Sequence, residues 1–259
     1  MVRGTRIMEA MLKLDGVCKR FGGLVATDHV SFSVPQGEIT GLIGPNGAGK
    51  STLMNLISGI YDVDEGHIYF EGKDITKVPA WKRARMGIGR TFQTPRFLYR
   101  SNILDNLLLG TDLGDQMNYF SSFVGKKGTN LKERLEELMP VAGFEIDWES
   151  DINAVPYGQR KLLEIVRSML ARPKVMLVDE PAAGLNNREI ENAMALLDLA
   201  AKKYNIGVLL IEHSMDMIMN SCSNIVVINF GKMICEGGPE KVASDPQVIE
   251  AYLGKDLDA

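Results

Sequence analysis

The stretch that most constrains this chain is residues 44–52, which read Gly-Pro-Asn-Gly-Ala-Gly-Lys-Ser-Thr. They fit the pattern Gly-x4-Gly-Lys-Ser/Thr, a loop whose backbone N–H groups wrap phosphates and whose side chains must therefore be small. Lys50 supplies a compact positive charge for the β- and γ-phosphates, and Ser51 offers its hydroxyl to Mg2+. Residues 38–43 predict a buried strand entering the loop, and residues 52–58 predict a helix whose N-terminal dipole attracts phosphate.

Strands and helices alternate along the chain around this loop. Short apolar runs at residues 175–178 and 207–211 predict fully buried parallel strands. Helices are predicted at residues 158–171 and 187–203, where apolar residues recur at helical spacing. This alternation predicts an α/β fold with a mainly parallel sheet.

Several shorter elements complete the prediction. Further strands are expected at residues 11–17, 26–34, 66–70, 87–92, 225–228 and 232–235, the last two as a hairpin. A short basic helix is predicted at residues 79–86, with Lys82, Arg83 and Arg85 on a solvated face. Residues 239–253 are predicted to close the chain as short helices.

The alternation of strands and helices is interrupted between residues 101 and 151, where a helical insert is predicted. Ser101 is expected to cap a helix that runs through Leu109. Residues 131–142 are amphipathic and predict a second helix. Residues 111–130 are polar and contain glycine, and they lead to no structural prediction.

Composition narrows the range of functions. Of 259 residues, 29 are basic and 33 acidic, which gives a net charge of -4 and no support for general nucleic-acid binding. Cys18, Cys222 and Cys235 have no metal-ligand spacing, so buried or unreactive thiols in a reducing compartment are expected. No stretch is as long and apolar as a membrane span, and the N-terminus lacks an apolar signal-peptide core. We therefore expect a soluble, cytosolic chain that reaches a membrane only through a partner.

Two carboxylates, Asp179 and Glu180, follow the strand predicted at residues 175–178. Ligands of open α/β sheets collect at the carboxyl ends of the strands. Asp179 is expected there to hold Mg2+ through water, and Glu180 to polarise an attacking water as a general base. Acidic residues also end strands for structural reasons alone, an alternative that Lys50 and Ser51 disfavour.

Taken in this order, the motifs resemble the nucleotide-binding subunit of an ABC transporter. The resemblance implies a P-loop NTPase (RecA-like) core with a mainly parallel sheet, an antiparallel β subdomain and a helical insert. It implies one domain over residues 11–255, with a core lobe at 11–93 and 172–235, a helical subdomain at about 94–171 and C-terminal helices at 236–255.

The same resemblance assigns site residues. It implies that ATP is bound by Phe21, which lies against adenine, and by the Walker A residues Gly44, Pro45, Asn46, Gly47, Ala48, Gly49, Lys50, Ser51 and Thr52. Its catalytic residues are the Walker B glutamate Glu180, the switch histidine His213 and the Q-loop glutamine Gln93. It assigns Mg2+ to Ser51, Gln93 and Asp179, and it places the D-loop at residues 183–186.

The signature motif departs from the family pattern. The family has Leu-Ser-Gly-Gly-Gln or Leu-Ser-Tyr-Gly-Gln, whereas this chain has Val155, Pro156, Tyr157, Gly158 and Gln159. The family's serine offers a hydroxyl to the γ-phosphate of the opposite subunit, and Pro156 can only preset the first helical turn. We expect residues 156–159 to complete a second subunit's ATP site with weaker closure. The alternative is a heterodimer with one weak composite site.

The edges of the motifs resemble the ATPases of branched-chain amino acid uptake. The matching stretches are residues 157–159, 179–186, 211–215 and 248–254. The resemblance implies an ATP-hydrolysing subunit that powers an importer of branched-chain or related amino acids. It implies as partners a second ATPase subunit, identical or different, transmembrane permease subunits and, indirectly, a periplasmic or extracellular binding protein. The implied location is cytoplasmic, peripheral on the inner face of the cell membrane.

Other functions stay open at this point. The chain could serve a lipopolysaccharide-type lipid exporter, or be a non-transport ABC ATPase that works on DNA or ribosomes. Given Pro156, it could also be a regulatory module that does not hydrolyse ATP. Phe97, Leu98 and Tyr99, next to Gln93, are expected either to seat the permease's coupling helix or to pack in the core.

Overall fold

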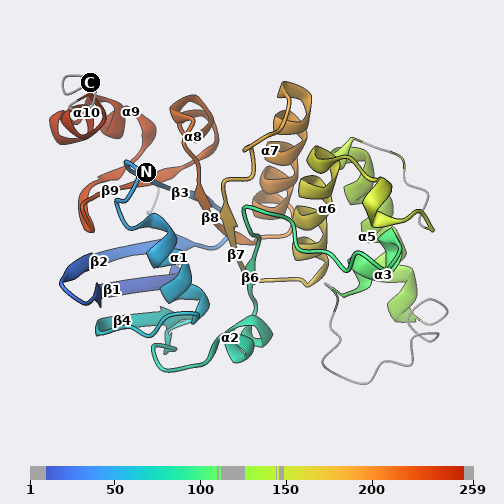
Figure 1. Cartoon of the computed structure of the whole chain (residues 1–259), viewed down its shortest axis with the longest axis horizontal. Helices are drawn as coiled ribbons and strands as arrows, with labels where there is room; N and C mark the ends of the chain where they lie inside the picture. Colours follow the sequence, from blue (N-terminus) through green and yellow to red (C-terminus); the bar gives the residue numbers. More distant parts are fainter. Residues whose placement is uncertain (1–9, 110, 112–125, 144, 146–148, 254–259) are drawn as a thin grey trace, which may run out of the picture.

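Two β-sheets organise the fold (Figure 1). The computed structural model describes residues 10–109, 111, 126–143, 145 and 149–253. The larger sheet has the strand order β10-β9-β3-β8-β7-β6, and the smaller one β2-β1-β4-β5. The strands are β1 (Ala10–Phe21), β2 (Leu24–Pro35), β3 (Ile39–Ile43), β4 (Glu65–Phe70), β5 (Lys73–Asp74), β6 (Ile88–Arg90), β7 (Val175–Asp179), β8 (Gly207–Ile211), β9 (Asn224–Asn229) and β10 (Lys232–Gly237).

The larger sheet is mainly parallel, as predicted. β3 runs parallel to β8 and β9, and β7 runs parallel to β6 and β8, while β10 is antiparallel to β9. Every residue of β3, β7 and β8 is buried, which is why each strand contains a nearly continuous apolar run. The smaller sheet is antiparallel throughout. The predicted α/β fold with a second, antiparallel sheet is therefore confirmed.

The described residues form helices beside the larger sheet and in the segment between β6 and β7. They are α1 (Lys50–Ser58), α2 (Ala80–Met86), α3 (Ile103–Leu108), α5 (Lys126–Ala142), α6 (Tyr157–Leu170), α7 (Asn187–Lys202), α8 (Met215–Ser221), α9 (Pro239–Ser244) and α10 (Pro246–Leu253). No helix within the described ranges has both the length and the apolar character that a membrane crossing requires.

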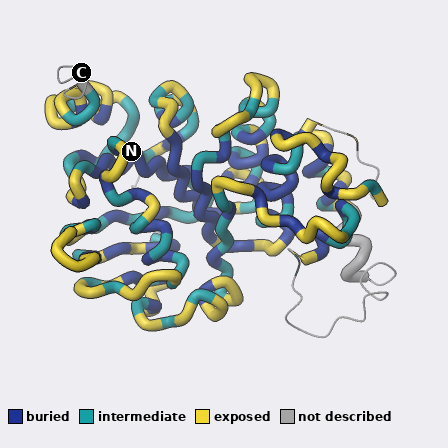
Figure 2. The backbone as a smooth tube through the Cα atoms, viewed as in Figure 1, coloured by how far each residue is buried: buried dark blue, intermediate teal, exposed yellow. Residues whose placement is uncertain are grey.

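Alternate residues of the parallel strands face two hydrophobic cores on opposite sides of the sheet. In β7, Met176 and Val178 belong to the core shared with α6 and α7. Val175 and Leu177 belong to the core shared with α1 and the antiparallel sheet. This division follows from the two-residue period of a strand. Figure 2 shows buried chain running through the middle of the molecule and exposed residues around its periphery.

The predicted helical insert is present. α3, α5 and α6 lie together on the right in Figure 1, and α6 packs against α3, α5 and α7. The cap of α3 differs from the prediction by one residue: the side chain of Asn102, rather than Ser101, accepts a hydrogen bond from the Asp105 N–H at 2.8 Å. Of the stretch that led to no prediction, residues 112–125 lie outside the described residues.

The prediction that Arg83 lies on a solvated face is wrong. Its side chain is only 2% exposed, whereas Lys82 and Arg85 are exposed as predicted. The guanidinium donates to the carbonyl oxygens of four residues at 2.7–2.9 Å, namely Leu56, Ile57, Thr76 and Val78. The first two are in the last turn of α1, where carbonyls lack their usual helical partners, although the Leu56 carbonyl also accepts from the Gly59 N–H at 3.2 Å. Arg83 therefore caps α1 and ties α2 to it.

Candidate active site

The loop at residues 44–49 joins β3 to α1 at the carboxyl edge of the larger sheet. Its backbone passes so close to its neighbours that two positions require glycine. A Cβ at Gly44 would stand 2.0 Å from the Ile228 carbonyl oxygen, and one at Gly49 would stand 2.4 Å from that of Ala26. Gly49 also has a φ of 108°, which disfavours other residues. The loop thus keeps its backbone bare in front of the N-terminus of α1.

Lys50 is buried at the start of α1. Its Nζ donates to the carbonyl oxygens of Gly44 at 2.6 Å and Pro45 at 3.0 Å. The ammonium group is therefore held within the loop itself, while the side chain of the next residue, Ser51, is exposed. A fixed cation and a free hydroxyl side by side are the groups that a nucleotide's phosphates and Mg2+ require.

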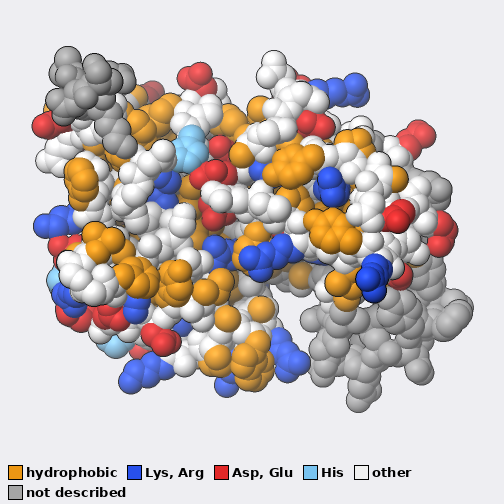
Figure 3. Space-filling model, in the orientation of Figure 1, with side chains coloured by type: hydrophobic (Ala, Val, Ile, Leu, Met, Phe, Trp, Pro, Cys, Tyr) orange, Lys and Arg blue, Asp and Glu red, His pale blue; other side chains and the backbone are white. Residues whose placement is uncertain are grey.

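A cavity of about 480 Å³ opens in front of this loop. It is lined by Phe21, Leu24, Val25, Ala26, Asn46, Gly47, Ala48, Gly49, Lys50, Ser51, Thr52, Glu180, His213 and Phe230. The structure therefore brings Phe21, the phosphate loop, Glu180 and His213 to one place. Figure 3 shows hydrophobic side chains gathered over the neighbouring end of the antiparallel sheet, where Phe21, Leu24 and Val25 are exposed.

Phe230 lines this cavity, and the sequence did not single it out. It stands at the tip of the β9–β10 hairpin with a φ of 45°, and it is 84% exposed. The next residue, Gly231, donates its N–H to the Ala48 carbonyl at 2.9 Å and accepts from the Asp28 N–H at 2.8 Å. The hairpin tip is thereby fixed between β2 and the phosphate loop. The only feature of the sequence that could have indicated this position was a phenylalanine next to a glycine in a predicted turn.

Asp179 ends β7 at the same edge of the sheet. Burial raises the pKa of its carboxyl group, and the guanidinium of Arg90, 3.9 Å from Oδ2, opposes that rise. Its Oδ1 is buried and makes no hydrogen bond to any described residue. A buried carboxylate oxygen without a donor, together with the Ser51 hydroxyl, fits the all-oxygen ligand preference of Mg2+.

Glu180 and His213 are in direct contact. Oε1 of Glu180 lies 2.8 Å from Nε2 of His213. The backbone of Glu180 has a φ of 47°, a left-handed conformation that is unusual for a residue with a side chain. Its N–H donates to the Ile211 carbonyl of β8 at 2.9 Å. This turn directs the carboxylate out of the strand and into the cavity.

Gln93 and the signature residues do not line this cavity. Gln93 is exposed, two residues beyond Thr91, whose Oγ1 lies 3.4 Å from the Asp179 nitrogen. The Tyr157 hydroxyl donates to the Gln93 carbonyl at 3.4 Å. The loop that contains Gln93 therefore touches the signature turn of the same chain.

The signature turn forms the start of α6. Pro156 is the N-cap residue, directly before the first helical residue Tyr157, and its carbonyl accepts from the Arg160 N–H at 3.0 Å. Gly158 is buried, and a Cβ there would stand 2.2 Å from Oε1 of Glu189. A side chain at Gly158 would therefore have to displace the Glu189 carboxylate, which packs against this glycine.

Three buried charged residues near the site were not anticipated from the sequence. They are Lys161, Glu164 and Glu212. Burial raises the pKa of Glu164 to about 7, and its carboxylate accepts from the Phe92 N–H at 3.4 Å. Lys161 and Glu164 lie among the buried apolar residues of α6. Charged residues within this apolar helix face were the only feature of the sequence that could have indicated buried charges.

The three cysteines are buried free thiols, as predicted. In the described part of the chain, one group offers three potential metal-ligand atoms within 4.8 Å of one another: Cys18, His29 and Glu65. The Arg20 guanidinium pairs with Glu65 at 2.5 Å, so this carboxylate already has a cationic partner.

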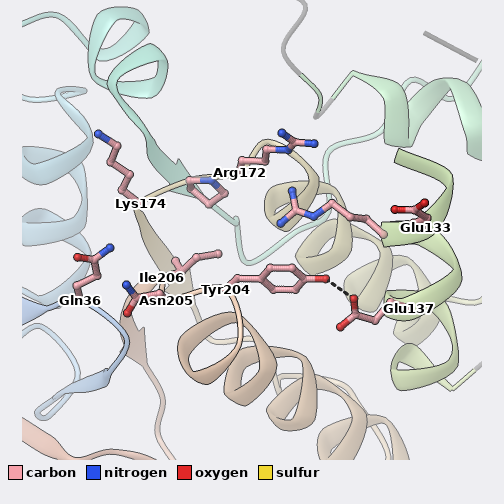
Figure 4. Close-up of a pocket in the computed structure, with 10 residues that line it drawn as sticks. Gln36, Glu133, Glu137, Arg172, Lys174, Tyr204, Asn205 and Ile206 are labelled. Carbon is pink, nitrogen blue, oxygen red and sulfur yellow. Dashed lines mark hydrogen bonds between the residues drawn. The ribbon is translucent and has the colours of Figure 1, made fainter. Parts of the chain in front are cut away.

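A second cavity, of about 520 Å³, opens at the amino edge of the sheet, where loops lead into β7 and β8 (Figure 4). Tyr204 donates its hydroxyl to Glu137 at 2.9 Å, and the Arg134 guanidinium lies 4.5 Å from the Tyr204 ring centre. The Nζ of Lys174 lies 2.6 Å from Oε1 of Glu71, a residue that does not line this cavity. The cavity shares no lining residue with the one in front of the phosphate loop.

Comparisons with known proteins agree with this geometry. The sequence profile of the ABC transporter family matches residues 27–183, and that of the branched-chain amino acid ATP-binding cassette transporters matches residues 232–258. The high-affinity branched-chain amino acid transport ATP-binding protein BraF of Pseudomonas aeruginosa is 36% identical over 255 residues, 95% of this chain and 98% of BraF. The probable branched-chain amino acid transport ATP-binding protein LivG of Methanocaldococcus jannaschii is 38% identical with the same coverage.

A solved structure gives the same result. The ATP-binding cassette of an ABC transporter in its ADP conformation superposes with a TM-score of 0.79 at 36% identity, over 95% of this chain and 99% of that one. The predicted P-loop NTPase fold and the predicted family are thereby confirmed. The chain belongs to the ABC transporter family, in its group of branched-chain amino acid ATP-binding cassettes, and is an ATPase subunit.

Proposed function

We propose that this chain powers an importer of branched-chain or related amino acids by hydrolysing ATP. The observation that carries the site assignment is the convergence of residues 46–52, Glu180 and His213 on one cavity. The import assignment rests on the names of the relatives and on the profile match at residues 232–258. The substrate class is therefore proposed by analogy with relatives.

Nucleotide binding is assigned to the phosphate loop and to Phe21. The backbone N–H groups of residues 44–52 and the Lys50 ammonium hold the phosphates, and the Phe21 ring packs against adenine. Ser51, Asp179 and Gln93 are the proposed residues for Mg2+, which when bound supplies positive charge to the phosphate oxygens. The unpaired Oδ1 of Asp179 supports this assignment.

Hydrolysis is assigned to Glu180 and His213. Glu180 accepts the proton of the attacking water, and His213 steadies the transferred phosphoryl group. The 2.8 Å contact between the two side chains supports this division of roles. Catalysis of this type consists of positioning and electrostatic stabilisation rather than covalent chemistry.

A complete site is proposed to need a second ATPase subunit, identical or different. Pro156, Tyr157, Gly158 and Gln159 do not line the cavity of their own chain. We assign them to the γ-phosphate of the opposite subunit, where the start of α6 presents its N–H groups. Pro156 has no hydroxyl for this contact, so closure is weaker than with serine.

Replacing Pro156 with serine is expected to tighten nucleotide-dependent dimerisation by about tenfold or more, because a hydrogen bond to a charged group contributes roughly 1.5–3 kcal/mol. Sedimentation of the purified protein with a non-hydrolysable ATP analogue measures the dimerisation constant. Pro156→Ala is the matched control, because it removes the ring without adding a hydroxyl. If the serine and alanine variants dimerise equally, the missing hydroxyl does not limit closure.

The permease contact is proposed at Leu98 and Tyr99. Both are half exposed, in the loop between β6 and α3, whereas Phe97 is buried with the Arg167 guanidinium 4.8 Å from its ring centre. Phe97 therefore packs in the core, and its two neighbours are free for a partner. Through this contact the chain would lie peripherally on the inner face of the cell membrane. The helical subdomain, about residues 94–171, would move relative to the core lobe as the dimer closes.

Reconstitution tests the proposed function. The chain is co-expressed with its candidate permease subunits and placed in vesicles that contain ATP and Mg2+, with a cognate binding protein outside. We expect uptake of labelled leucine that stops when internal ATP is removed. Co-purification with a lipopolysaccharide-bridging partner, combined with no amino acid uptake, would instead identify an exporter.

A further inference from the structure

The second turn of α6 carries a lysine whose charge is buried. Lys161 is 3% exposed, and burial lowers the pKa of its ammonium group. Its Nζ donates to the carbonyl oxygens of Glu180 at 2.8 Å, Ala183 at 2.9 Å and Pro181 at 3.5 Å. A lysine has three N–H donors, so the whole donor capacity of Lys161 is directed at the turn formed by residues 180–183.

A buried carboxylate contacts the same turn through its N–H groups. Oε1 of Glu212 accepts from the Ala182 N–H at 2.7 Å, and Oε2 accepts from the His213 N–H at 3.2 Å. Glu212 therefore joins the turn to the backbone of His213. The carbonyls of the turn face a cation and one of its N–H groups faces an anion, so both buried charges are satisfied.

This arrangement fixes a residue in an unfavourable backbone conformation. Glu180 has a φ of 47°, which persists only when its surroundings hold it. Its N–H is bound to β8 through the Ile211 carbonyl, and its carbonyl is bound by Lys161. With both ends of the residue held, the carboxylate is directed at His213, 2.8 Å away.

We propose that Lys161 and Glu212 are positioning residues that hold the turn at residues 180–183, so that the Glu180 carboxylate stays against His213. This inference rests on the proposed role of Glu180 as general base. Because Lys161 stands on the helix that begins with the signature turn, it also ties that turn to the catalytic turn of the same chain.

Lys161→Met in the full-length chain tests the proposal by single-turnover hydrolysis of labelled ATP. Because a small displacement of a catalytic group costs up to about 100-fold, we expect a rate loss of about 10- to 100-fold. ATP affinity should change by no more than about twofold, since the phosphate loop is untouched. Lys202→Met, at an exposed lysine on α7, is the control and should keep the parent rate.

The same substitution in a Glu180→Gln background separates positioning from general structural support. A residue that acts through Glu180 should lower the remaining rate by less than about twofold once Glu180 is removed. An equal loss in both backgrounds, or a parent-like rate for Lys161→Met alone, overturns the proposal. Near-normal hydrolysis by Glu180→Gln alone would overturn the general-base assignment and the positioning role with it.

Glu212→Gln decides the matter if Lys161→Met does not fold, as judged by circular dichroism. Glutamine keeps the shape of Glu212 but loses its charge and one acceptor oxygen. We expect a lower hydrolysis rate with unchanged ATP affinity, and again no further loss in the Glu180→Gln background. A parent-like rate for a folded Glu212→Gln protein would overturn the shared positioning role.

Discussion

Glu180→Gln is expected to lower the rate of ATP hydrolysis by about 10²–10⁴-fold, the usual effect of removing a general base. Glutamine has the same shape as glutamate and can still contact Nε2 of His213, but it cannot take a proton from water. The phosphate loop is unchanged, so ATP affinity should stay close to that of the parent. Phosphate release measures the first quantity, and binding of a fluorescent ATP analogue measures the second.

Glu191→Gln is the matched control for this experiment, because Glu191 is an exposed glutamate on α7. It should hydrolyse ATP at the parent rate. If Glu180→Gln also retained most of the parent rate, Glu180 would not be the base. A rate loss explained entirely by weaker ATP binding would likewise contradict the assignment.

Arg83→Met is expected to lower the free energy of unfolding by about 2–5 kcal/mol, because buried carbonyls that lose their donor each cost roughly 1–3 kcal/mol. Methionine can fill part of the space, but it cannot donate to the Leu56 and Ile57 carbonyls at the end of α1. That helix begins at Lys50, so loosening its end should also weaken nucleotide binding. Urea unfolding measures the stability change.

Lys82→Met provides the comparison on the same helix, at an exposed position. Its free energy of unfolding should lie within about 0.5 kcal/mol of the parent value, as is usual for surface substitutions. Equal stability of the Arg83 and Lys82 variants would show that the four hydrogen bonds of Arg83 contribute little.

Local patterns predicted the elements that depend on local physics. The glycine spacing of residues 44–49 predicted a bare loop, and the structure shows carbonyls of Ile228 and Ala26 where side chains would have to fit. The apolar run at residues 175–178 predicted a buried strand and placed Asp179 and Glu180 at its end. These predictions succeeded because the burial of a strand and the geometry of a tight loop depend mainly on residues that are adjacent in the sequence.

Contacts between distant residues could not be predicted in this way. Arg83 was expected in solvent because a basic helix face usually is solvated, but its partners at Leu56 and Ile57 are in another helix. Lys161 is buried for a similar reason, since the carbonyls it binds begin at Glu180. A guanidinium or ammonium group can be buried when tertiary structure supplies carbonyl acceptors, and no local pattern reports where those acceptors will be.

The contacts of α6 have a consequence for how hydrolysis is coupled to transport. The helix is 14 residues long, or about 21 Å at the usual rise, and it begins with the turn proposed to face the second subunit. Lys161 binds the turn at residues 180–183, and Glu164 and Arg167 bind the backbone of residues 92–96, the loop that contains Gln93 and leads to the proposed permease contact. A single helix therefore contacts both the turn at residues 180–183 and the loop that contains Gln93. If the proposed contacts with the second subunit and the permease are made, a rotation of α6 would act on both of them and on Glu180 at once.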